Sequence, residues 1–497
     1  MKLNHIYKSI ACGVLLAMTA TSCDLDYNPV DTYSDVTEGV NKTDEKPIFN
    51  SVQDVETSMV TLHKKFRDQQ EHWYVDKLLI GDAHSDNAYA GTTGAEVVPY
   101  ETNSIEGSNS VLKRDWDRFL GDIAVANRII VGCDQLKALS ESERGKYQSQ
   151  AKIFRAMVMF DMVRLWGNFP VITTVGGDIT EDNVEEMYPT YFPPQNTAEE
   201  AYAQIEKDLT EAVENPNTPT NDTSDKSILT KSVARAMLAK VYAEKPLRDY
   251  AKVIKYADEL AADGFDLVED FSDLWAYDTE KKDCRVRNTK EAILEAHFPP
   301  GSGNWCTWMF GRNLSNWDES FTWAKWITPS RDLIRLYEEQ GDTKRYNESV
   351  VWYDCGWSNY YPADHYAFMY KCRSAFNSII YLRYADILLL KAEAKIMGEA
   401  PDLNGAADII DRIRNRAGLG KLPQSTRSSK EALLQAYMDE RRMELAFEGQ
   451  RWYDLKRTNR LDLFTSLNGR NYLMYYPVPQ SERDLAGAEN YPQNDGY

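Results

Sequence analysis

The spacing of apolar residues predicts a chain that is helical over most of its length. Apolar positions recur every three or four residues over two early stretches, residues 50–79 and 112–139. The same period returns over residues 198–213, 227–244 and 249–262. We expect each stretch to form a helix with one buried face.

The segment 151–170 has the composition of a helix buried on nearly all sides. Gly167 and Pro170 are expected to end this helix. Asp161 and Arg164 interrupt the apolar surface, and buried charges need partners. We therefore expect these two residues, three positions apart, to pair with each other.

Two helical stretches share a spacing of small and apolar residues that indicates an internal repeat. The matching positions are Ala234, Met237, Leu238 and Val241 in the first and Ala385, Leu388, Leu389 and Ala392 in the second. The segment 384–417 is 34 residues long, the period of a tetratricopeptide helix pair. Plain helical hairpins would give the same spacing, so both interpretations stay open.

The helical period lapses over residues 264–377, where the sequence is rich in aromatic residues, Gly and Asn. One clear helix is expected there, after Ser330 as its N-cap. Helices resume over residues 379–397, 406–417, 431–447 and 452–458. The pattern predicts a mainly α fold: a helical scaffold at about 48–263 and 378–460, with a loop-rich region at about 264–377 inserted.

The first 23 residues indicate export and lipid anchoring. Lys2 and Lys8 precede an apolar run, residues 10–20, that is too short to span a bilayer. Small residues then lead directly to Cys23, as a lipoprotein signal peptidase requires. An ordinary secretory signal with a chance cysteine is the alternative. We expect residues 1–22 to be removed, Cys23 to be lipidated and residues 23–497 to form one unit, since no flexible linker divides them.

Charge and motifs exclude several classes of function. The 497-residue chain carries a formal net charge of −20, which argues against nucleic acid or anionic lipid as a partner. Its cysteines and six histidines form no zinc pattern, and no cofactor or nucleophile motif is present. We therefore expect no metal, no cofactor and no catalysis.

Tryptophan is concentrated in the loop-rich region, where five of the twelve tryptophans fall within 22 residues. These are Trp305, Trp308, Trp317, Trp323 and Trp326, interleaved with polar residues that include Arg312 and Asn316. A sugar ring has apolar C–H faces that stack on an indole and a rim of hydroxyls that needs donors and acceptors. The cluster thus favours glycan binding, although any one of these indoles could instead fill a core beneath loops.

Several segments, taken in order, resemble the SusD/RagB family of nutrient-binding outer-membrane lipoproteins. They are residues 23–29 (CDLDYNP), 151–170, 381–394 (YLRYADILLLKAEA), 415–418 (NRAG), 440–456 (ERRMELAFEGQRWYDLK) and 476–479 (YPVP). The resemblance covers nearly the whole chain after residue 22. It implies a SusD-like fold with tetratricopeptide-like helical pairs and a loop-rich ligand-binding region on one side.

The resemblance further implies a function. Such proteins are cell-surface receptors of the outer membrane that pass oligosaccharide, or in some cases peptide, to a SusC-like TonB-dependent porin. In starch-binding relatives the loop after the first long helix contributes to the ligand site. By resemblance, the candidate ligand-binding residues there are Asp82, Asp86, Asn87 and Tyr89, and Trp73, which precedes the loop, is a further candidate. An ordinary capping loop is the alternative.

The charged residues of the recognisable segments favour a structural role. Arg383 and Asp386 are spaced to pair with each other, and Glu440 and Glu444 are expected to form salt bridges along one helix.

Glycosidases also use two carboxylates, so a surface glycosidase stays the alternative from another class, with Asp82 and Asp318 as the pair to test. Within the family, a peptide receptor is the alternative to a glycan receptor. The aromatic stretch 352–370 could be core, rim or porin contact.

Overall fold

The computed structural model describes residues 47–91, 94–278, 280–281, 283–298, 303–306, 326–371, 373–461 and 470–497. Cys23 and the predicted signal peptide lie outside these residues. The chain divides into two compact units. One consists of Pro47–Val175 and Pro189–Tyr497, and the other of Met1–Lys46 and Gly176–Tyr188. In the smaller unit the structure describes one short helix, α7 (Val184–Met187), which follows a turn held by the Asn183 side chain.

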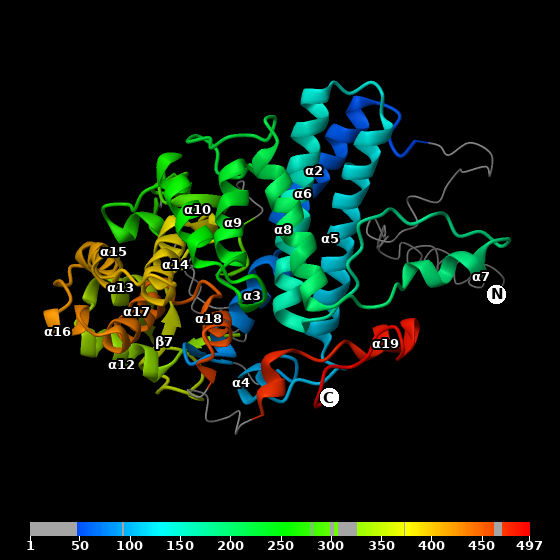
Figure 1. Ribbon diagram of the computed structural model, residues 1–497. Helices are drawn as coiled ribbons and strands as arrows, with labels where there is room; N and C mark the ends of the chain where they lie inside the picture. Colours follow the sequence, from blue (N-terminus) through cyan, green and yellow to red (C-terminus); the bar gives the residue numbers. More distant parts are fainter. Residues whose placement is uncertain are drawn as a thin grey trace, which may run out of the picture. The chain divides into compact units, whose positions relative to one another are not determined.

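The larger unit is built mainly from helices, as the apolar spacing predicts (Figure 1). The longer ones are α2 (Val52–Asp68), α5 (Ser110–Gln135), α6 (Glu141–Trp166), α8 (Ala198–Glu214), α9 (Lys231–Val241), α10 (Tyr250–Ala262), α12 (Arg331–Gln340), α14 (Tyr384–Met397), α15 (Leu403–Arg416) and α17 (Lys430–Leu445). Shorter ones are α4 (Val98–Thr102), α13 (Thr343–Ser349), α16 (Gln424–Arg427), α18 (Arg451–Arg457) and α19 (Gln480–Ala486).

Consecutive helices pack against each other along the scaffold. Helix α5 packs on α6, α6 on α8, α9 on α10, and α14 on both α15 and α17. Figure 1 shows α2, α5, α6 and α8 side by side, and α9, α10 and α14 beside them. The predicted pair at 384–417 is the hairpin of α14 and α15. The prediction of a mainly helical fold with tetratricopeptide-like pairs is confirmed.

Helix α6 illustrates how the sequence sets these elements. Ser140 caps its first turn, and Glu143 completes the capping box. The helix ends at Gly167, whose φ of +74° suits glycine. Its last four turns are buried, and the predicted pair of Asp161 with Arg164 is present. Tyr381 donates a second hydrogen bond to Asp161 at 3.0 Å, which anchors β8 to α6.

The expected loop-rich region forms short antiparallel strand pairs, two of them with strands from outside it. They are β1 (Ala88–Tyr89) with β5 (Thr328–Pro329), β2 (Tyr277–Asp278) with β3 (Asp283–Cys284), β4 (Ala292–Ala296) with β8 (Ile379–Arg383), and β6 (Val350–Tyr353) with β7 (Tyr366–Met369). Helix α12 begins after Ser330 as predicted, because the Ser330 hydroxyl accepts the Leu333 N–H at 3.1 Å. The prediction that helix resumes at 379 is wrong for residues 379–383, which pair with β4 instead.

A buried network of arginine and glutamate joins the later elements. Arg383 contacts Glu291 at 2.8 Å, Glu444 at 2.6 Å and Glu448 at 2.7 Å. The predicted pair of Arg383 with Asp386 is wrong: Arg383 is the N-cap of α14, and Asp386 pairs with Arg441 at 2.7 Å and with Lys240 at 2.5 Å.

Glu440 and Glu444 are both fully buried and form salt bridges as predicted, but with arginines of other elements rather than along their own helix. Their arginine partners are Arg345 for both, Arg414 for Glu440, and Arg383 and Arg416 for Glu444. These carboxylates hold helix α17 to its neighbours.

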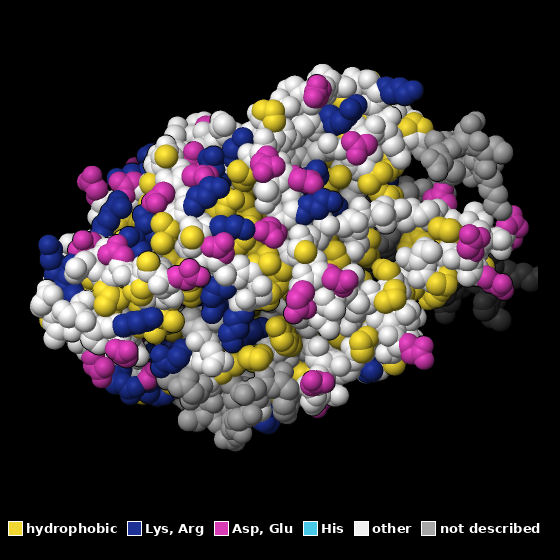
Figure 2. All heavy atoms as spheres, viewed as in Figure 1, with side chains coloured by type: hydrophobic (Ala, Val, Ile, Leu, Met, Phe, Trp, Pro, Cys, Tyr) yellow, Lys and Arg dark blue, Asp and Glu magenta, His cyan; other side chains and the backbone are white. Residues whose placement is uncertain are grey.

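The described residues contain no helix long and apolar enough to cross a membrane. Within the same residues there is no group of three or more His, Cys, Asp and Glu side chains that could hold a metal ion. Acidic and basic side chains alternate over the face that carries α8, α9, α10 and α14 (Figure 2). That face has no basic patch of the kind that nucleic acid requires.

Candidate functional site

Several predicted ligand-binding residues lie outside the described residues: Trp308, Arg312, Asn316, Trp317 and Trp323. Their segment is flanked by two tryptophans that the structure does describe. Trp305 is 40% exposed, and its backbone N–H donates to the Gln70 side chain at 2.8 Å. Trp326 is partly buried against the core, two residues before β5.

The structure places Trp73, a predicted ligand-binding residue, inside the scaffold. Its side chain is fully buried, and the indole Nε1–H donates to Asp122 at 3.0 Å. The ring packs edge-on against Phe66 and Tyr381. Trp73 lies on η2 (Glu71–Val75), a π-helical turn that continues into α3 (Asp76–Leu78) and the π-helical η3 (Leu79–Ala83).

The loop after η3 also serves the scaffold, and it holds Asp82 and Asn87, two predicted ligand-binding residues, away from solvent. Both side chains are buried, and Asn87 donates to Asp82 at 2.9 Å. Asp82 also accepts backbone N–H groups of Phe447 at 3.1 Å and Gly449 at 2.8 Å. Burial raises the pKa of Asp82 to about 6, although these hydrogen bonds act in the opposite direction.

Asp86 is held by arginines rather than left free for ligand. Arg451 forms a two-pronged contact with its carboxylate at 2.7 and 2.8 Å. Burial alone would raise the pKa of Asp86, but Arg451 and Arg442 lower it to about 2. Asp86 therefore carries a charge at neutral pH that the protein itself neutralises.

Tyr89, the last residue of the predicted loop, belongs to a group of aromatic side chains that contact one another in pairs. We define the aromatic surface as Tyr89, Trp352, Tyr360, Tyr361 and His365. Tyr89 stacks on Tyr360 with ring centroids 4.5 Å apart and planes within 4°. Trp352 stacks on His365 in the same way at 4.2 Å. Tyr361, which is buried, meets Trp352 edge-on at 5.1 Å.

Strand pairing and loop geometry bring these five residues together. Tyr89 ends β1, Trp352 lies in β6, and the other three lie in the connection between β6 and β7. Because Tyr89 pairs with Thr328 across β1 and β5, the end of the tryptophan-rich segment also reaches this surface. His365 is exposed, and Tyr89, Trp352 and Tyr360 are partly exposed.

Polar groups border the aromatic surface. The Arg331 guanidinium lies 4.5 Å above the Tyr361 ring. Tyr360 donates its hydroxyl to Glu101 at 2.8 Å, and Asn359 donates to the Gly91 carbonyl at 3.0 Å. Burial and the Glu101 carboxylate raise the pKa of Tyr360, which keeps this hydroxyl protonated at neutral pH. Stacked rings beside carboxylate, amide and guanidinium groups suit the apolar faces and hydroxyl rim of a sugar.

Sequence reasoning identified Tyr89 and Trp326 but left Trp352, Tyr360, Tyr361 and His365 without a role. The available signal was the tyrosine-rich stretch 352–370, which could equally have been core. Only the packing of the β6–β7 connection against β1 distinguishes these possibilities.

Comparisons with known proteins give a consistent family. A model described as SusD family matches residues 373–469, and one described as starch-binding associating with outer membrane matches residues 32–243. A SusD-like protein of Bacteroides ovatus is 25% identical, with 90% of this chain and 81% of the relative covered. SusD-like protein P38 of Formosa agariphila is 24% identical, with 82% and 83% covered.

Solved structures of similar proteins share the fold. A SusD superfamily protein from Bacteroides vulgatus superposes with a TM-score of 0.72 at 19% identity, covering 90% of this chain and 99% of that one. A laminarin-binding SusD-like protein gives 0.68 at 22% identity, covering 90% and 100%. Surface glycan-binding protein A from Bacteroides thetaiotaomicron, in complex with laminarihexaose, gives 0.69 at 17% identity, covering 89% and 99%.

Proposed function

Because this chain is a member of the SusD family, we propose that it is a non-catalytic receptor that captures glycan at the bacterial cell surface. The aromatic surface is the observation that carries the proposal. It holds two stacked ring pairs, and a sugar that packs on them would bring its hydroxyls toward Arg331 and the neighbouring acceptors.

The names of similar proteins support a glycan over other ligands. One solved relative is a laminarin-binding protein, and another holds laminarihexaose. Peptide is the less favoured ligand, because a peptide site needs backbone-spaced polar groups and side-chain pockets rather than stacked rings.

We further propose that lipid on Cys23 anchors the protein in the outer membrane, facing outward. The family description that mentions the outer membrane supports this location. In this position the receptor would pass its glycan to a SusC-like TonB-dependent porin. The transfer favours modest affinity, because a carrier must release what it binds.

The proposal is tested by shortening the stacked tyrosines. Replacing Tyr360 with alanine removes one ring of the Tyr89 stack, and we expect retention on a polysaccharide affinity gel to fall about tenfold, equivalent to about 1.4 kcal/mol. Tyr89→Ala should act similarly. Tyr147→Ala, on helix α6, is the control, since this tyrosine lies on the helical scaffold away from the strands. Equal retention by the Tyr360 variant and the unchanged protein would exclude the aromatic surface as the glycan site.

A further inference from the structure

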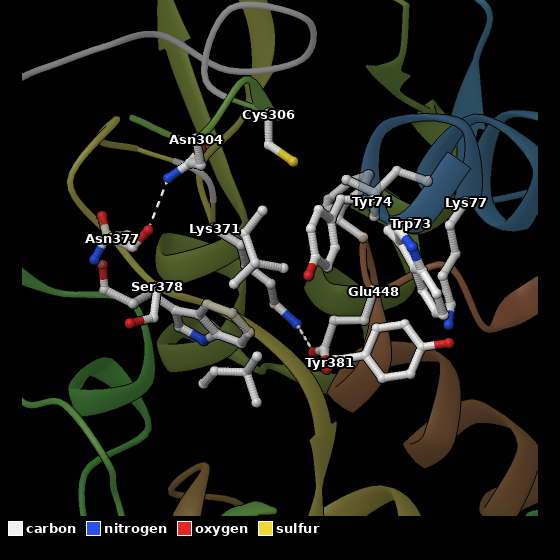
Figure 3. A pocket seen from close by; sticks show the side chains of 15 residues that line it. Trp73, Tyr74, Lys77, Asn304, Cys306, Lys371, Asn377, Ser378, Tyr381 and Glu448 are labelled. Atoms are coloured by element: carbon white, nitrogen blue, oxygen red, sulfur yellow. Dashed lines mark hydrogen bonds and ion pairs between the residues drawn. The ribbon is translucent and has the colours of Figure 1, made fainter. Parts of the chain in front are cut away.

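A pocket separate from the aromatic surface lies beneath η2, between the first π-helical turn and strand β8 (Figure 3). Its space, counted together with solvent at its open mouth, is about 590 Å³. Tyr74, Trp275 and Tyr381 are among its mostly apolar and aromatic lining residues. No residue of the aromatic surface lines it.

The wall formed by η2 and α3 has an unusual backbone. Trp73 and Tyr74 lie on the π-helical turn η2, and Lys77 and Leu78 lie on α3, which has π-helical turns on both sides. Such turns occur mostly as single insertions in α-helices, frequently at functional sites. All four residues line the pocket.

One ion pair in the pocket offers both a donor and an acceptor. Figure 3 shows Lys371 and Glu448 joined between Tyr74 on one side and Ser378 on the other. Lys371 donates to Glu448 at 2.6 Å and to the Glu444 carbonyl at 3.0 Å, so one of its three N–H groups has no partner among the described residues. Among the described residues, Glu448 Oε2 accepts a hydrogen bond only from Arg383, so it keeps a lone pair for a further donor.

Trp275 adds a second unused donor. Its indole is 7% exposed, and Nε1–H has no hydrogen-bond partner among the described residues. The ring lies 4.8 Å from the Lys371 ammonium. Buried donors are rarely left unpaired, so an acceptor from a bound molecule would complete this site.

The charges in the pocket favour a neutral ligand. Lys371 and Glu448 cancel each other, and Lys77 already lies 3.9 Å from Asp161 and 3.8 Å above the Tyr381 ring. Burial lowers the pKa of Lys77 to about 7, which further weakens the attraction for an anion. A neutral molecule with adjacent hydroxyls and an apolar face matches both the polar pair and the aromatic walls.

We propose that this pocket binds a single neutral sugar ring, with neighbouring hydroxyls on Lys371 and Glu448 and the ring between the aromatic walls. The inference rests on the proposed function, because it assigns one unit of the captured glycan to a second site. Long chains would be held on the aromatic surface, and a single ring would be recognised here.

The test is a titration of the protein lacking residues 1–23 with monosaccharides, followed by calorimetry and tryptophan fluorescence. Glucose, galactose, mannose and xylose are the neutral probes, and glucuronic acid is the anionic one. We expect saturable millimolar binding of at least one neutral sugar. Trp275→Phe keeps an aromatic ring but removes the N–H, and it should weaken binding about tenfold.

Two further variants complete the test. Ile379→Trp, which enlarges a partly exposed pocket residue, should abolish monosaccharide binding but leave retention on polysaccharide gel intact. Trp116→Phe is the matched control, because it also removes an unpartnered buried indole N–H but lies outside the pocket. It should bind the sugar normally.

The outcomes separate this inference from the proposed function. Polysaccharide retention without saturation by any monosaccharide would overturn the pocket assignment alone, and binding of glucuronic acid only would overturn the neutral ligand. Monosaccharide binding that survives in both pocket variants would also overturn it. Sugar binding in the pocket without any polysaccharide retention would support the pocket and contradict the aromatic surface.

Discussion

Replacing Arg383 with methionine should lower the free energy of unfolding by about 3–5 kcal/mol, because it removes a buried cation that three carboxylates share. The Arg383 side chain is only 2% exposed. Its guanidinium contacts Glu291, Glu444 and Glu448 at 2.6 to 2.8 Å. Methionine fills a similar volume but supplies no charge and no donor. Chemical denaturation of the protein without residues 1–23 measures the loss.

Arg335→Met is the matched control, because this arginine also pairs with two carboxylates but its side chain is 62% exposed. Exposed ion pairs contribute little, so we expect a change below about 1 kcal/mol. A similar small loss for Arg383→Met would show that the buried network does not hold the elements together.

Replacing Gly81 with alanine should destabilise the protein by about 3 kcal/mol, because two backbone segments meet at this position without room for a side chain. A Cβ on Gly81 would lie 2.3 Å from the carbonyl carbon of Gly449 and 2.4 Å from its Cα. Relief requires a shift of the backbone, which would also disturb the N–H of Gly449 that Asp82 accepts. Thermal and chemical unfolding of the purified variant measure the effect.

Gly121→Ala should change stability in the opposite direction. Gly121 lies inside helix α5, and a Cβ there meets nothing within 4 Å. Alanine favours the helix, so we expect a gain of about 0.5–1 kcal/mol. Similar effects of the two substitutions would contradict the close approach of η3 to the segment after α17.

The helical scaffold could be predicted because its signals are local. The helix over 151–166 ends at Gly167 as the sequence indicates, and its Asp161–Arg164 pair spans a single turn. The hairpin of α14 and α15 follows from spacing in the same way.

Contacts between distant segments could not be predicted. Asp82 accepts hydrogen bonds from residues more than three hundred and sixty positions away, and no local pattern carries that information. Arg383 and Asp386 have the spacing of a helical pair. However, Arg383 is the last residue of β8 and precedes helix α14, so the two residues do not share one helix. Composition alone could not separate buried from accessible polar residues in the loop 81–89.

The candidate site was predictable only in part. Aromatic residues beside polar ones pointed to sugar binding, and Tyr89 does lie in such a setting. Its stacking partner Tyr360 comes from a connection between two strands that pair only in the folded chain. The pocket near Trp275 gave no sequence signal, because its lining residues come from at least five separate segments.

The most direct test of the account is capture of glycans by the protein lacking residues 1–23 on an array of immobilised poly- and oligosaccharides, with mass spectrometry of each ligand afterwards. We predict retention of at least one glycan class, loss of that retention in Tyr360→Ala, and recovery of the glycan chemically unchanged. Shortened glycan would make the protein an enzyme, and no retention of any glycan, with retention of peptides instead, would contradict a glycan receptor.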